Sequence, residues 1–164
     1  VLNRTLVTNN NKKMLELTAN FQSGPAYLNQ PLWVTITLKN AGDSPLLINT
    51  RFAMGYKISI SRELYAELVD ETALQNAVYS PVKINRDDPV TTDYSLLQSG
   101  KSITKKIDLF HYYHPRKPGK YSITIFYQAD EALKNRPAAV CKGTISTNPV
   151  SIEVLEGKLP RQNE

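Results

Sequence analysis

The chain has 164 residues, enough for one domain with a substantial core, because a domain of this size buries roughly 70% of its unfolded surface. Its 41% hydrophobic and 21% charged residues exclude a disordered chain. The sequence contains no apolar run of about 18 residues, which a membrane-spanning helix would require. The net charge of +5 comes from dispersed bases without a basic stripe carrying stacking aromatics, so we expect no nucleic-acid partner.

The first part of the chain predicts a short polar arm followed by strands. Residues 1–12 are polar, and we expect them to form a flexible N-terminal segment before a domain at 13–156. Residues 14–21 predict the first strand. In 32–40, hydrophobic and polar residues alternate strictly, which is the period of a half-buried strand and predicts a central one.

The rest of the chain continues this pattern, with turns such as 40–45, 98–100 and 117–119 between the segments. Further strands are predicted at 44–50, 56–62, 64–70, 101–109, 120–128 and 149–156. Residues 62–68 also fit a short helix by periodicity, and 128–136 is a second helix candidate. Short strands at this spacing favour an all-β antiparallel domain. We expect 157–164 to be a flexible C-terminal tail.

Two long connections, 76–97 and 129–148, are the first places to look for function, because long loops in a compact domain are usually functional or disordered. Candidate contact residues in them are Tyr79, Arg86, Asp88, Tyr94, Arg136 and Lys142. Asp87, Asp88 and Asp93 offer oxygen ligands suited to calcium. They lack the spacing of a defined calcium loop, so an ordinary turn around Pro89 is the stronger interpretation.

Both histidines, His111 and His114, lie in the segment DLFHYYHPRKPGKY as a HxxH pattern. Zinc needs three or four ligands, and an extended segment would turn residues three apart to opposite sides. The sequence implies no third ligand, so these are weak metal candidates and we predict neither a metal nor another cofactor. An ordinary connection between two strands is the preferred interpretation.

No catalytic motif is visible, and we predict that the protein is not an enzyme. Stretches such as GxSxG, HExxH or a phosphate-binding loop are absent from the sequence. The single cysteine, Cys141, excludes an internal disulfide and reads as a semi-buried small residue. Trp33 lies on the polar face of its strand, so it is either exposed, as a platform for a sugar or a protein, or covered by the connection 76–97. Nine tyrosines add to this hint of aromatic binding.

The order of features from PLWVTITLKNAGDSPL through LLQSGKSITKKIDL to PGKYSITIFY resembles immunoglobulin-like sandwich domains of bacterial secreted and cell-envelope proteins. It is more distantly similar to the pro-regions of aspzincin metalloproteases and to the Bacillus intracellular proteinase inhibitor. The likeness covers about residues 14–155 and implies a two-sheet antiparallel β-sandwich of about seven to nine strands. Gly119 and Tyr121 match the tyrosine corner of such domains, in which the tyrosine hydroxyl bonds back to the preceding crossover.

The resemblance leads to three hypotheses for function. The first is a non-catalytic binding or spacer module of a secreted, periplasmic or cell-envelope protein, which contacts a protein partner through the end loops 85–95 and 129–143. The second is a protease regulator, either an inhibitor or a pro-domain, that uses a proline-bounded loop such as 81–89. The third is a carbohydrate-binding module that uses Trp33 and tyrosines.

Overall fold

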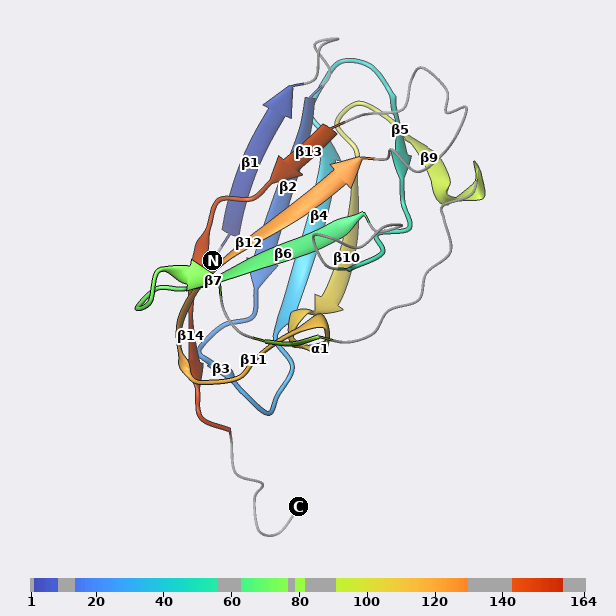
Figure 1. The fold of residues 1–164 in the computed structure, drawn as a ribbon. Coiled ribbons are helices and arrows are strands. Elements are labelled where there is room, and N and C mark those ends of the chain that lie inside the picture. Colours follow the sequence, from blue (N-terminus) through green and yellow to red (C-terminus); the bar gives the residue numbers. More distant parts are fainter. Residues whose placement is uncertain are drawn as a thin grey trace.

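The structure is a computed structural model, which describes residues 2–8, 14–55, 63–76, 79–81, 91–129 and 143–157. It is an all-β protein with several antiparallel sheets (Figure 1). The strands in the first half of the chain are β1 (Leu2–Thr8), β2 (Met14–Phe21), β3 (Ala26–Tyr27), β4 (Trp33–Asn40), β5 (Leu46–Asn49), β6 (Leu64–Asp70), β7 (Gln75–Asn76) and β8 (Tyr79–Pro81).

The second half of the chain adds six strands and two short helices. The 3₁₀ turn η1 (Thr91–Asp93) comes first, and α1 (Leu109–Tyr112) is a single helical turn. The strands are β9 (Tyr94–Leu97), β10 (Ser102–Asp108), β11 (Tyr113–Pro115), β12 (Gly119–Ala129), β13 (Gly143–Ser146) and β14 (Val150–Leu155).

Two larger sheets carry the fold. A four-stranded sheet has the order β1-β2-β4-β10, and a six-stranded sheet has the order β3-β14-β12-β6-β7, with β13 paired to β12. The described strand pairs within these two sheets are antiparallel except that of β14 with β3. Two small ribbons, β5-β9 and β8-β11, complete the described pairings. As predicted, 32–40 and 120–128 are central strands, with partners on both sides.

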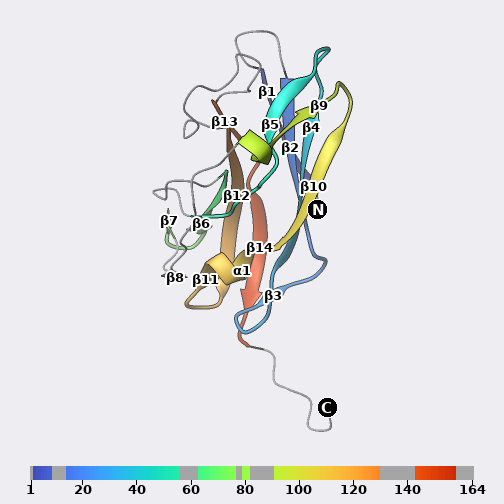
Figure 2. The same cartoon turned by 90° about the vertical axis from the view of Figure 1, so that its right-hand side faces the viewer.

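A single hydrophobic core joins the two larger sheets, which stand as two layers when the molecule is seen edge-on (Figure 2). The inward side of β4 contributes Val34, Ile36 and Leu38, each fully buried. The inward side of β12 contributes Tyr121, Ile123, Ile125 and Tyr127. These are the faces that the alternation in the sequence predicts, because successive side chains of a strand point to opposite sides.

Several predictions about the elements need correction. The N-terminal segment is not a loose arm throughout, because residues 2–8 form β1 and pair with β2 over their whole length. Without β1, strand β2 would be an edge strand with unpaired backbone N–H and C=O groups. Residues 2–8 pair with these groups. Of the predicted tail 157–164, residues 158–164 lie outside the described residues, as does the predicted strand 56–62.

The ambiguous segment 62–68 is not a helix, because Leu64–Asp70 is strand β6, hydrogen-bonded between β12 and β7. The second helix candidate is also wrong at its start, since Gln128 and Ala129 end strand β12. The strand number exceeds the predicted seven to nine because the long connections contain short strands that pair locally, including β8, β9 and β13. Short pairings of two to four residues leave little periodicity in a sequence.

A buried ion pair joins Arg51, which follows β5, to Glu63, which precedes β6. Arg51 Nε and Nη2 donate to the two carboxylate oxygens of Glu63 at 2.7 and 2.8 Å, and Glu63 is 3% exposed. Next to this pair, Phe52 adopts a φ of +49°, which residues with a Cβ rarely adopt, and its ring meets that of Tyr127 edge-on at 5.8 Å. A bidentate contact of this kind holds both side chains in one geometry.

Candidate functional site

Trp33 begins β4 on the outer face of the four-stranded sheet and is 42% exposed. Of the two alternatives for this residue, the structure therefore supports exposure. Its backbone is held by one residue, because its N–H donates to Gln22 Oε1 at 2.9 Å and its carbonyl accepts from the Gln22 N–H at 3.0 Å. The Lys106 ammonium lies 5.1 Å from the centre of the indole ring. Trp33 is thus an exposed aromatic side chain beside a cation.

A second exposed feature is the ribbon of β5 and β9, which lies at the upper right in Figure 1. Leu46 and Leu97 form one opposed pair and face the core, so the next pair, Leu47 and Leu96, faces outward. Leu96 is 54% exposed, and Leu47 is half-buried. Tyr94 lies two residues before Leu96 and therefore on the same face, where it is half-buried. We call Leu47, Tyr94 and Leu96 the ribbon patch.

The ribbon patch includes one of the predicted contact residues, Tyr94, and Leu96 is one that sequence reasoning missed. The pattern YSLL places Leu96 in an apolar run that reads as buried, and only the pairing with β5 decides which leucine faces outward. Tyr79 lies in β8 opposite Pro115. The predicted residues Arg86, Asp88, Arg136, Lys142 and Cys141, and the acidic Asp87, lie outside the described residues.

The two histidines lie in different elements. His111 is in α1 and meets the ring of Tyr112 edge-on at 5.0 Å, whereas His114 is in β11 and meets the ring of Phe110 at 6.1 Å. The helical turn starts at Asp108, whose carboxylate accepts the N–H of Phe110 at 3.1 Å as an N-terminal cap. Within the described part of the chain, no three His, Cys, Asp or Glu side chains come together as a metal-ion site.

The predicted tyrosine-corner hydrogen bond is present at the start of β12. The hydroxyl of Tyr121 donates to the carbonyl of Lys117 at 2.7 Å, and burial raises the pKa of this hydroxyl, with a smaller contribution from the Asp70 carboxylate. Gly119 precedes it with a φ of +149°, a conformation open mainly to glycine. Gly119 and Tyr121 therefore hold the crossover against β12 and act as structural residues.

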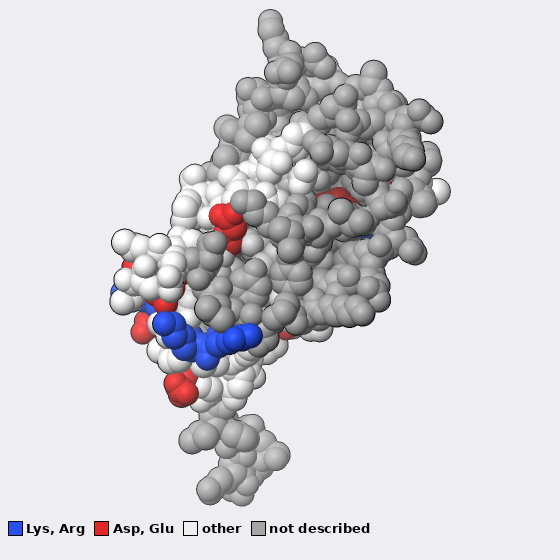
Figure 3. All heavy atoms as spheres, in the orientation of Figure 1, with Lys and Arg blue, Asp and Glu red and all other residues white. Residues whose placement is uncertain are grey.

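Asp70 is the charged group nearest this corner. The N–H of Ala73, 3.2 Å from Asp70 Oδ1, does most to lower the pKa of the carboxyl, and the N–H of Thr72 and the Lys117 ammonium act in the same direction against burial. Figure 3 shows this face of the molecule, where the basic atoms form a short band with acidic atoms on either side. Charges of both signs are mixed over the part of this face that is described.

More of the tyrosines are buried in the core than the sequence suggested. Tyr113, Tyr121 and Tyr127 are at most 1% exposed, and Tyr65 is stacked on Phe126 at 4.6 Å between ring centres. The buried hydroxyls have partners, since Tyr113 donates to the Gly55 carbonyl and Tyr127 donates to the Asn49 carbonyl. The interpretation of the tyrosines as a binding signal is therefore wrong for these four residues.

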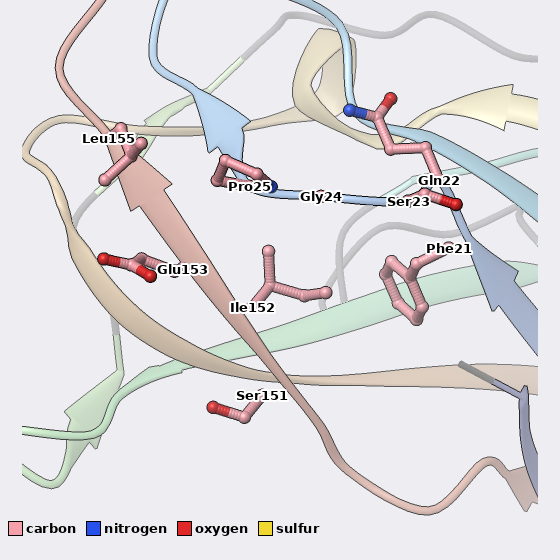
Figure 4. A pocket seen from close by; sticks show the side chains of 9 residues that line it. All are labelled: Phe21, Gln22, Ser23, Gly24, Pro25, Ser151, Ile152, Glu153 and Leu155. Atoms are coloured by element: carbon pink, nitrogen blue, oxygen red, sulfur yellow. The ribbon is translucent and has the colours of Figure 1, made fainter.

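A shallow groove of about 320 Å³ lies between the turn after β2 and strand β14 (Figure 4). Its lining is Phe21, Gln22, Ser23, Gly24, Pro25, Ser151, Ile152, Glu153 and Leu155. The side-chain oxygen of Gln22 already accepts the N–H of Trp33, and Ser151 and Glu153 are exposed. The volume is at the lower end for small-molecule sites, and few polar groups converge in it.

No protein-family model matches the sequence, and no curated protein matches it either. Among the described residues, no helix is long and apolar enough to span a membrane.

Proposed function

We propose that the protein is a non-catalytic binding or spacer module with an immunoglobulin-like β-sandwich fold, belonging to a secreted, periplasmic or cell-envelope protein and contacting a protein partner. The fold assignment is supported by the two layers that share one core and by the hydrogen bond from Tyr121 to Lys117. Both features are typical of immunoglobulin-like domains.

The observation that carries the binding proposal is the ribbon patch. It places an exposed leucine, a half-buried leucine and Tyr94 together on a two-stranded ribbon whose other side is anchored in the core by Leu46 and Leu97. Large exposed apolar side chains that group on one face are typical of protein-interaction sites, and their rigid support lowers the entropic cost of binding. Of the three patch residues, Tyr94 lies within the end loop 85–95 predicted from the sequence, whereas Leu96 follows that loop and Leu47 lies in β5.

The experiment is a capture of partners from envelope and secreted fractions, followed by binding measurements with the purified partner. We expect L96E to weaken binding at least about tenfold, because a charge in the buried centre of an interface is left without a partner. L74E is the matched control, since Leu74 is 83% exposed but lies in the turn between β6 and β7. Equal binding by wild type and L96E, or no partner in either fraction, contradicts the proposed contact.

A further inference from the structure

On the outer face of the four-stranded sheet, the side chains of β2, β4 and β10 stand in polar rows. Rows arise because directly opposed residues of antiparallel strands point to the same side of the sheet. From β2 across β4 to β10, the rows are Asn20–Thr35–Lys106, Thr18–Thr37–Thr104 and Glu16–Lys39–Ser102. In the middle row, the hydroxyls of Thr37 and Thr104 lie 3.1 Å apart and form a hydrogen bond.

Trp33 stands at the end of these rows and is the only aromatic side chain among them. It is diagonal to Lys106 across the β4–β10 pair, which brings the ammonium over the indole while 42% of Trp33 stays exposed. Neighbouring strands are about 4.8 Å apart, and alternate residues along a strand about 6.7 Å apart. An aromatic platform therefore continues into a regular array of hydroxyl and amide groups.

The exposed charge on this face is positive. Lys106 is exposed and Lys39 half-exposed, whereas Glu16 is only 7% exposed. Asp108, opposite Trp33, has one carboxylate oxygen that accepts the N–H groups of both Leu32 and Phe110 at 3.1 Å. Asp108 is half-buried and has one oxygen occupied by these N–H groups, so the exposed charge beside Trp33 is the Lys106 ammonium.

We propose that this face, centred on Trp33 and Lys106, binds an acidic oligosaccharide. A pyranose ring has an apolar face that stacks on an indole, and its hydroxyls both donate and accept hydrogen bonds, as do the threonine hydroxyls and the Asn20 amide. The Lys106 ammonium pairs with a uronate carboxylate on the stacked or the adjacent sugar. This site is separate from the ribbon patch and does not depend on the protein partner proposed above.

Other classes of ligand fit this face less well. A nucleic acid is held by several phosphate contacts along a basic stripe, whereas one exposed lysine stands beside Trp33 on the described part of this face. A protein interface has a more apolar centre, whereas the part of the rows next to Trp33, across β2, β4 and β10, is polar in every position. A flat array of hydroxyls next to one aromatic ring and one cation matches an acidic sugar chain best.

The test is a titration of the full chain with tetragalacturonate, with cellotetraose as the uncharged probe. Trp33 is the only tryptophan of the protein, so its fluorescence reports directly from the proposed site. We expect a saturable change in emission with tetragalacturonate, a weaker response to cellotetraose, and weaker binding at high salt because the Lys106 charge is screened.

Variants separate the site from unspecific attraction. By calorimetry, we expect W33A to abolish tetragalacturonate binding and K106Q to weaken it about threefold or more, with a smaller salt dependence than wild type. K120Q is the charge-matched control, because Lys120 lies on the six-stranded sheet and its loss leaves binding unchanged. We expect L96E to bind tetragalacturonate as wild type does, because Leu96 belongs to the ribbon patch and not to the Trp33 site. Absence of saturable binding, equal loss in K106Q and K120Q, or preference for the neutral sugar or for a single-stranded oligonucleotide overturns the proposal.

Discussion

At the scale of single residues, the buried ion pair between Arg51 and Glu63 is the most consequential contact. Glu63 is 3% exposed, and besides the guanidinium it has the N–H of Ala53 at a long 3.4 Å. Removing one partner of a buried pair leaves a charge that has lost its water and its counter-ion. The intact pair therefore adds little net stability, whereas the loss of one partner destabilises the protein because the other charge stays buried.

We predict that R51A lowers the free energy of unfolding by about 3–5 kcal/mol, because it leaves the Glu63 carboxylate buried without its main partner. Urea unfolding measures this as a lower midpoint with an unchanged slope. The double variant R51M/E63L, which removes both charges, should recover most of the loss. The exposed R116A is a control, with a change within about 0.5 kcal/mol. If the double variant is as unstable as R51A, the buried charge is not the cause.

At the scale of elements, Asn40 ties two turns of the sheet together. It is fully buried at the end of β4, and its side-chain amide donates to the carbonyls of Ser44 at 2.8 Å and of Leu97 at 2.9 Å. Its side-chain oxygen accepts the N–H of Gly42 at 3.0 Å. One side chain therefore connects the β4–β5 turn to the end of β9.

We predict that N40A destabilises the protein by about 2–3 kcal/mol, because the buried carbonyl of Leu97 loses its side-chain donor. N40D should be at least as harmful at neutral pH, since a carboxylate oxygen would then face two carbonyl oxygens. Thermal unfolding measures both, and D43A in the same turn serves as the exposed control. Hydrogen exchange of the Gly42 N–H should accelerate in N40A but not in D43A. A stable N40D would show that the two donated hydrogen bonds contribute little.

At the scale of the whole molecule, the two larger sheets share one core and should unfold together. Trp33 reports from the four-stranded sheet, whereas Ile125 is fully buried on the six-stranded sheet. We predict that I125A lowers stability by about 2–5 kcal/mol and shifts the Trp33 fluorescence midpoint as much as the far-UV circular dichroism midpoint. S122A, at a half-exposed position of the same strand, should shift neither. Separate midpoints would mean that the sheets unfold independently.

The strands that could be predicted are those with long alternation. Residues 14–21 and 64–70 were predicted with the bounds that β2 and β6 have. The segment 32–40 begins one residue before β4, and 120–128 is one residue shorter than β12 at each end. The strands β3, β7, β8 and β11 are two or three residues long, too short to produce a period. The helical turn α1 depends on the cap at Asp108. A four-residue turn is too short for its sequence pattern to predict a helix.

The candidate sites could be predicted only in part. Trp33 and Tyr94 were selected from the sequence, but their relation to Lys106 and Leu96 follows from pairings between β4 and β10 and between β5 and β9. These pairings join residues about 50 to 70 positions apart in the chain. Nothing local to Lys106 distinguishes it from Lys105, whose ammonium instead donates to the carbonyl of Phe52 at 3.0 Å.

By itself, the sequence determined the all-β class, the inward and outward faces of the long strands, and the tyrosine corner. These depend on the two-residue period of a strand and on contacts between residues a few positions apart, as between Tyr121 and Lys117. The tertiary structure alone decided that Arg51 meets Glu63, that most tyrosines named above are buried, and that Trp33 stays exposed beside Lys106. The reason is that strand register and sheet packing bring together residues that are far apart in the chain, and the local sequence around one residue does not predict which distant residue it will meet.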